Sequence, residues 1–127
     1  MIICDTDIMV DILRGHAGAL AWLGANSHET IAIPGLVVME LVQGCRNKVE
    51  QNLVNKTLKG YHVLWPSHEA CNHALRFFSA QHLSHGIGII DALIAETAVE
   101  ADAPLHTFNQ KHYLPHMRLR TIQPYQR

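Results

Sequence analysis

Short apolar segments alternate with longer helical segments along this chain of 127 residues, and this alternation limits its fold more than any other feature. Strands are predicted over 2–4, 30–33, 62–65 and 104–108, with a fifth within 118–124. Helices are predicted over 8–14, 17–25, 36–45, 47–59, 67–81 and 89–100. Strands separated by helices pair in parallel through right-handed crossovers. We therefore predict a single α/β domain over 1–127, in three α/β/α layers with a central, mainly parallel sheet of four to five strands.

The distribution of charge is uneven, although the net charge is only −1. Such a balance gives the whole molecule no attraction to nucleic acid or to anionic membranes. Residues 77–110 contain four acids and no lysine or arginine, whereas residues 111–127 contain four basic residues and no acid. An acidic site beside a basic tail suits a metal-assisted reaction on a polyanion.

The chain shows no sign of export or of membrane insertion. Its longest apolar run, 31–39, is too short to span a bilayer, and its start lacks the basic and apolar regions of a signal peptide. The three cysteines have no CxxC spacing and lie among apolar neighbours, which predicts buried free thiols in a reducing cytoplasm: Cys4, Cys45 and Cys71.

The ten histidines are scattered and none has the spacing of a zinc site. The nearest approach to a cluster is formed by His106, His112 and His116, which we expect at the surface or at helix caps.

Two aspartates follow the first predicted strand. A carboxylate at the end of a buried strand is costly to bury unless it is paired. Asp7 suits the N-cap of the following helix. Because one helix needs only one cap, Asp5 is the better candidate for a functional role.

Two further acids interrupt apolar helix starts. Glu40 is the only charge in 36–42, and solvent exposure and a functional role explain it about equally well. Asp91 lies in the first turn of an apolar helix, where the helix dipole alone would also favour it. Glu96 is five residues further on, about 140° round the helix, so we expect it to be solvated.

Taken together, Asp5, Glu40 and Asp91 are lone carboxylates at the ends of elements in a parallel α/β frame. Converging carboxylates repel one another unless a divalent cation is present, and oxygen ligands select Mg²⁺ or Mn²⁺. Such ions commonly serve phosphoryl transfer.

Four segments, in order, resemble the motifs of PIN-domain endoribonucleases, in particular the VapC-type toxins of toxin–antitoxin pairs. They are Ile2–Thr6, Val37–Gly44, Asp91–Ala95 and Leu105–Tyr113. The resemblance covers almost the whole chain. It implies a three-layer α/β/α fold and metal-dependent hydrolysis of RNA.

The resemblance also implies roles for individual residues. Asp5, Glu40 and Asp91 take the catalytic acidic positions and would hold Mg²⁺ or Mn²⁺. Thr6 and Thr107 would orient carboxylates or water through their hydroxyl groups.

A fourth acid is often found in the last motif of this family, where the present chain has Asn109 or His112. Its absence argues against a second tightly held ion. Family members are usually homodimers, held inactive by a cognate antitoxin that enters the acidic groove. The resemblance therefore also implies a protein partner besides the RNA substrate.

Three other interpretations of the sequence remain. Asp5 and Asp7 mimic the DxD start of haloacid-dehalogenase-type phosphatases, although the later lysine and acidic pair of that site are not evident. A receiver module would need an aspartate after the third strand, where the sequence has Pro66. A PIN-type nuclease could also act in RNA processing without an antitoxin. The sequence does not predict which RNA is cut.

Overall fold

Five parallel strands form one sheet in the computed structural model, which describes all 127 residues. They are β1 (Ile2–Cys4), β2 (Ile31–Pro34), β3 (His62–Leu64), β4 (Leu105–His106) and β5 (Thr121–Ile122). Their spatial order is β3-β2-β1-β4-β5, and all four neighbouring pairs are parallel. The predicted sheet is confirmed, including its fifth strand.

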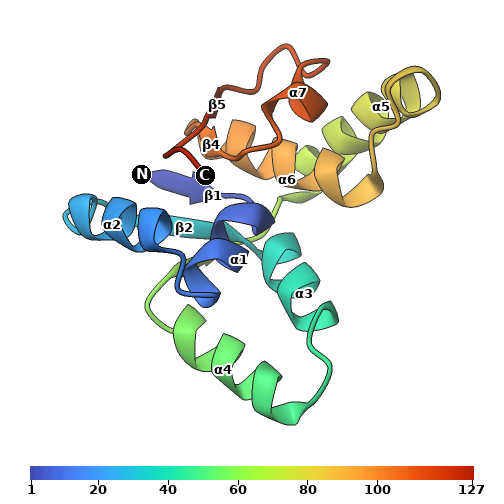
Figure 1. Cartoon of the computed structure of the whole chain (residues 1–127). Helices are drawn as coiled ribbons and strands as arrows, with labels where there is room; N and C mark the ends of the chain where they lie inside the picture. Colours follow the sequence, from blue (N-terminus) through green and yellow to red (C-terminus); the bar gives the residue numbers. More distant parts are fainter.

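Seven helices cover the two faces of this sheet. They are α1 (Thr6–Leu13), α2 (Ala17–Ala25), α3 (Gly35–Gln43), α4 (Lys48–Leu58), α5 (His68–His85), α6 (Ile89–Glu100) and α7 (Gln110–Tyr113). Figure 1 shows α1 to α4 on one side of the strands and α5 to α7 on the other. This arrangement confirms the three α/β/α layers. None of the helices combines the length and the apolar character needed to cross a membrane.

The boundaries of several elements differ from those predicted. β1 has the predicted bounds and β2 is shifted by one residue, whereas β3 and β4 are shorter than predicted, and β4 and β5 have two residues each. The helix α5 continues four residues beyond Gln81 and ends at Gly86, whose positive φ of 65° suits a residue without a Cβ. The short helix α7 was not predicted, because four residues carry too little periodicity to indicate a helix.

The order of the strands reverses beside β1, and this reversal positions the functional site. The chain runs outward from β1 through β2 to β3, then returns to the other side of β1 as β4. Cys4 lies opposite His106 in the β1–β4 register, so Asp5 and Thr107 leave the sheet side by side. The crevice beyond the carboxyl ends of strands at such a reversal is where open α/β sheets bind ligands.

The core packs between the layers and is made of fully buried aliphatic side chains. Ile3, Ile33 and Leu105 come from three adjacent strands, while Ile8 and Ile94 come from helices on opposite faces. Since these helices begin beside the ends of the strands, their packing fixes the first turns of α1 and α6 against the sheet.

All three cysteines are free thiols, as predicted. The prediction that all are buried holds for Cys4, whereas Cys45 is half-buried and Cys71 is exposed on α5. Burial raises the pKa of the Cys4 thiol to about 12, and the nearby Asp7 and Asp5 carboxylates add to the effect.

Candidate active site

A pocket of about 470 Å³ opens beyond the carboxyl end of β1, where the strand order reverses. Five of the residues selected from the sequence line it: Asp5, Thr6, Glu40, Asp91 and Asn109. The remaining one, Thr107, is fully buried beside Asp5. The structure therefore brings together every site residue that the sequence predicted.

The Asp5 carboxylate is held by three donors. Its Oδ1 accepts a hydrogen bond from the Thr6 N–H at 2.8 Å. Its Oδ2 accepts from the Thr107 hydroxyl at 2.9 Å and from the Tyr113 hydroxyl at 3.1 Å. Only 6% of the residue is exposed. The side chain is therefore fixed beneath the floor of the pocket.

The prediction that Asp7 is the N-cap of α1 was wrong, because Asp5 occupies the N-cap position. The N-cap must have an extended backbone outside the helix, and Asp5 has ψ 169° while Thr6 is already helical. Asp7 instead lies in the first turn and accepts hydrogen bonds from the Ile8 N–H at 2.8 Å and the Phe108 N–H at 2.9 Å. It joins α1 to the loop after β4.

Burial makes both of these aspartates harder to ionise. Burial raises the pKa of Asp5 to about 6, with the Asp7 charge adding to the effect and the three hydrogen bonds opposing it. Burial also raises the pKa of Asp7. A cation in the pocket would relieve this cost, since an opposite charge favours the ionised form of a carboxyl group.

Glu40 lines the pocket from α3 and is not fully exposed to solvent. Its Oε1 accepts a hydrogen bond from the Thr6 hydroxyl at 2.7 Å. Thr6 thus contacts two of the acids, through its N–H to Asp5 and through its hydroxyl to Glu40. The side chain of Glu40 is half-buried.

Asp91 reaches the pocket from the first turn of α6. The N-cap of this helix is Gly88, which has no side chain of its own to cap the helix. A Cβ at Gly88 would lie 3.3 Å from Asp91 Oδ2, so the glycine leaves room for the carboxylate. His112 Nε2 lies 2.7 Å from the same oxygen, and the Tyr113 hydroxyl donates to Asp91 Oδ1 at 3.4 Å.

The sequence did not single out Tyr113 as a site residue, although its ring is buried beneath the pocket. Its hydroxyl donates to both Asp5 and Asp91. The only indication in the sequence was an aromatic residue near the end of the last motif. The helix α7 that carries it was itself not predicted.

The expectation that the three clustered histidines lie at the surface or at caps was wrong. His106 and His116 are buried, and His112 pairs with Asp91. His106 Nδ1 is the one buried side-chain nitrogen or oxygen without a hydrogen-bond partner.

The expectation that Glu96 is solvated was also wrong, because only 2% of it is exposed. Its Oε1 lies 2.7 Å from His116 Nε2 and accepts a hydrogen bond from Arg118 Nη2 at 2.9 Å. The helical geometry correctly placed Glu96 and Asp91 on different faces of α6. The face that carries Glu96 is covered by His116 and Arg118 from the loop after α7, however, and not by water.

The set of donors in the pocket suits a hard divalent cation, since the acids offer only carboxylate oxygens. No three acidic, histidine or cysteine side chains are grouped closely enough to hold an ion in their present conformations. Each candidate carboxylate already accepts a hydrogen bond, from Thr107 and Tyr113 at Asp5, from Thr6 at Glu40, and from Tyr113 at Asp91. The donor set fits such an ion by its chemistry, since Asp5, Glu40 and Asp91 line the same pocket and offer carboxylate oxygens.

Curated proteins with similar sequences are ribonucleases by name. Ribonuclease VapC19 of Mycobacterium tuberculosis H37Rv is 36% identical over 118 residues, covering 89% of this chain and 92% of that protein. Ribonuclease VapC10 of the same strain is 32% identical over 115 residues, covering 89% and 86%.

Solved structures share the fold. A toxin–antitoxin complex from Klebsiella pneumoniae contains a chain with a TM-score of 0.78 and 21% identity, and both chains are covered completely. VapBC2 from Rickettsia felis, bound to a DNA fragment from its promoter, gives 0.77 and 24%, covering 96% of this chain and 98% of that one. The PIN domain model matches residues 2–115, and the chain therefore belongs to the PIN-domain family.

Proposed function

We propose that this protein is a Mg²⁺- or Mn²⁺-dependent endoribonuclease of the VapC type, acting in the cytoplasm. The observation that carries the proposal is the convergence of Asp5, Glu40 and Asp91, from three separate elements, on one pocket at the carboxyl end of the sheet. The similarity to two proteins named as ribonucleases supports RNA as the substrate.

Asp5, Asp91 and Glu40 are the residues that would hold the ion. When bound, a divalent ion makes water more acidic and stabilises charge on the leaving oxygen of a phosphodiester. Burial and the Asp7 charge raise the pKa of Asp5 to about 6, so ionising Asp5 in the metal-free pocket is unfavourable, and binding of a cation would offset that cost.

The protein's own groups orient this pocket. Thr107 and Tyr113 fix one oxygen of Asp5, and Thr6 fixes one oxygen of Glu40. The second oxygen of Glu40 accepts no hydrogen bond from the protein, so it is free to accept a proton from the attacking water. We therefore propose that Glu40 acts as the general base for attack on the phosphate.

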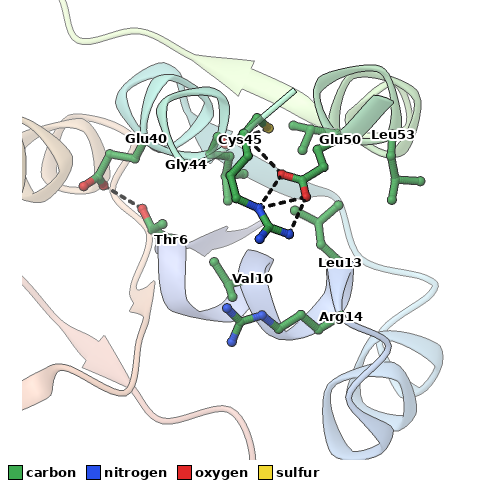
Figure 2. A pocket seen from close by; sticks show the side chains of 12 residues that line it. Thr6, Val10, Leu13, Arg14, Glu40, Gly44, Cys45, Glu50 and Leu53 are labelled. Carbon is green, nitrogen blue, oxygen red and sulfur yellow. Dashed lines mark hydrogen bonds and ion pairs between the residues drawn. The ribbon is translucent and has the colours of Figure 1, made fainter. Parts of the chain in front are cut away.

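An antitoxin is the proposed regulator. The solved structures with this fold include complexes described as toxin–antitoxin or VapBC assemblies. A groove of about 570 Å³ runs between α1, α3 and α4 (Figure 2), and shares Thr6, Arg14 and Glu40 with the acidic pocket. Its walls include Leu13 and Leu53. An amphipathic segment of an antitoxin could bury apolar side chains there and reach the acids.

A homodimer remains part of the proposal. The packed pair α5–α6 presents an apolar depression that includes Leu75 and Ile89, which are 62% and 64% exposed. Light scattering on the purified protein would give its mass in solution. The change Leu75→Glu should convert a dimer to a monomer if this face is the interface.

Cleavage of a labelled RNA in Mg²⁺ or Mn²⁺ tests the enzymatic part of the proposal. Excess EDTA should abolish cleavage, and Asp5→Asn, Glu40→Gln and Asp91→Asn should each remove it while the protein remains folded. Undiminished cleavage in EDTA would exclude the metal-dependent mechanism. Capture of RNA ends by sequencing would then identify the site that is cut.

The phosphatase alternative is disfavoured by the position of Asp7. A phosphatase of the DxD type uses its second aspartate as an acid and base, but Asp7 is occupied by the Ile8 and Phe108 amides. If the purified protein released phosphate from a small phosphomonoester, the phosphatase function would be favoured instead. Nuclease action without an antitoxin would be indicated if coexpression with the product of the neighbouring gene fails to inhibit cleavage.

A further inference from the structure

The acidic pocket has a second chemical feature, which the carboxylates do not explain. Two arginines stand among its lining residues, Arg14 from the end of α1 and Arg127 from the last position of the sequence. An RNA backbone is a polyanion, so a pocket lined by carboxylates repels it unless cations offset that charge.

Arg127 is held in one orientation by contacts on several sides. Its Nε donates to Asp11 Oδ2 at 3.0 Å, and its Nη2 donates to Asp11 Oδ1 at 3.2 Å. The same Nη2 lies 3.4 Å from the Asp7 carbonyl oxygen. The guanidinium carbon lies 4.3 Å from the centre of the Phe108 ring. A fork-like pair of hydrogen bonds together with ring stacking is a specific property of arginine.

Asp11 is itself fixed, which strengthens this arrangement. The Tyr125 hydroxyl donates to Asp11 Oδ2 at 2.8 Å. Burial by itself would raise the pKa of Asp11, but the hydrogen bonds from Arg127 and Tyr125 outweigh it and lower the pKa. The ion pair therefore persists at neutral pH and keeps the guanidinium at the rim of the pocket.

These contacts leave part of the guanidinium free. Arginine has five N–H donors, and the contacts to Asp11 and Asp7 use those on Nε and Nη2. The two donors on Nη1 have no partner in the protein, and 47% of the Arg127 side chain is exposed. The two N–H bonds of Nη1 diverge, so this edge offers a phosphate oxygen a single charge-assisted hydrogen bond, while the parallel fork of Nε and Nη2 is used by Asp11.

Arg14 provides a second cation. It lies one turn after Asp11 on α1, is exposed, and pairs with no acidic side chain. Figure 2 shows its side chain along α1 beside Val10. Both Arg14 and Val10 line the acidic pocket as well as the adjoining groove.

We propose that Arg127 and Arg14 form a binding site for a backbone phosphate of the RNA, on the rim of the pocket and next to the bond that is cut. Arg127 binds through its free Nη1 edge, while Asp11, Phe108 and Tyr125 hold it in place. Arg14 adds a second contact. This inference rests on the proposed ribonuclease function and assigns a phosphate position to that same site.

The salt dependence of RNA binding tests the proposal. Fluorescence anisotropy would measure binding of a fluorescein-labelled oligouridylate in Mg²⁺, with Glu40→Gln present in every protein to prevent cleavage. Adding Arg127→Gln should weaken binding about tenfold at low salt. It should also lower the slope of log Kd against log salt by about 0.7, the value for one lost phosphate contact on a single strand. Arg14→Gln should lower the slope similarly, with a smaller loss of affinity.

Two matched variants separate phosphate binding from a structural role. Arg127→Lys keeps the positive charge but loses the forked geometry of the guanidinium. Compared with Arg127→Gln, it should therefore regain the full slope of log Kd against log salt but only part of the affinity for RNA. Arg120→Gln removes a positive charge outside the pocket, where Arg120 pairs with the exposed Asp102, and should change neither quantity. If Arg127 merely anchors the tail, both changes at Arg127 will lower the melting temperature and leave the slope as it was.

The same measurements distinguish failure of the phosphate site from failure of the proposed ribonuclease function. If the unmutated protein cleaves RNA while Arg127→Gln retains both the affinity for RNA and the salt slope, the proposed phosphate site is wrong but the proposed ribonuclease function is not affected. If the unmutated protein neither binds nor cleaves RNA in Mg²⁺ or Mn²⁺, the proposed function fails and the phosphate site fails with it.

Discussion

The hydroxyl of Tyr113 donates a hydrogen bond of 3.1 Å to Asp5, across 108 positions of sequence. The same hydroxyl lies 3.4 Å from Asp91. Burial, together with the charges of Asp5 and Asp91, raises the pKa of this phenol far above its usual value. Tyr113 therefore keeps its proton at any working pH and acts as a permanent donor between the two carboxylates.

We predict that Tyr113→Phe slows RNA cleavage by about 10- to 100-fold, which is the usual effect of removing a partner that orients metal ligands. The ring remains to fill its buried position, so the fold should persist. The loss should be accompanied by weaker binding of Mn²⁺, measured by calorimetry. An unchanged Mn²⁺ affinity with unchanged cleavage would show that Tyr113 serves only the core.

The second prediction concerns Asp5→Asn in the metal-free protein. The pKa of Asp5 is about 6 in the fold against an ordinary 3.8, so the native state binds a proton that the unfolded state releases. Stability of the unmutated protein should therefore fall as pH rises from about 4 to about 6. Asparagine has no such charge, and the variant should be more stable by up to ~3 kcal/mol above pH ~7.

Urea denaturation in EDTA between pH ~4 and ~8 would measure this difference. The two proteins should approach each other at the acidic end of that range, where Asp5 is protonated in the native state and partly protonated in the unfolded chain. Asp102→Asn is a suitable control, because the Asp102 side chain is 98% exposed. A variant of Asp5 that is less stable at pH 8 would assign the carboxylate a structural role.

The sequence predicted the architecture and the candidate site well because both depend on local patterns. Alternating apolar and helical segments implied the parallel sheet. Three lone acids at the ends of elements implied one pocket, because parallel strands place their carboxyl ends at a common edge. Asp5, Glu40 and Asp91 do line a single pocket.

Contacts between distant segments could not be predicted in the same way. Periodicity gives the direction of Glu96 on α6, but only the tertiary structure covers it with His116 and Arg118. Likewise, capping preference favours Asp5 and Asp7 equally, and the backbone conformation decides between them. The clamp of Arg127 on Asp11 spans 116 positions and has no local signal.

The third prediction concerns the buried partner of Glu96. His116→Leu would remove one of the two partners of a carboxylate that is 2% exposed and leave Arg118 as the other, and losing one hydrogen-bond partner of a buried group costs about 1–3 kcal/mol. Thermal or urea unfolding would measure the loss. His85→Leu, at the exposed end of α5, should have little effect. At low temperature, where the variant is folded, the rate of RNA cleavage should not change, because Glu96 lies outside the acidic pocket. A large fall in that rate would show that Glu96 and His116 contribute to the reaction.

The last prediction concerns Asn109, which lines the pocket at its exposed edge. Its N–H donates to the Thr107 hydroxyl at 2.9 Å, so the residue is held close to Asp5, but its amide adds no negative charge. Three carboxylates more than offset the charge of one divalent ion but leave too little negative charge for a second, which needs further charged oxygens to offset its dehydration. Calorimetric titration with Mn²⁺ should therefore give one tight site in the unmutated protein. Asn109→Asp should strengthen a second site, whereas Asn109→Ala should slow cleavage and leave the first site intact. Two equally tight ions in the unmutated protein without RNA would show that Asp7 or Asp11 also acts as a ligand.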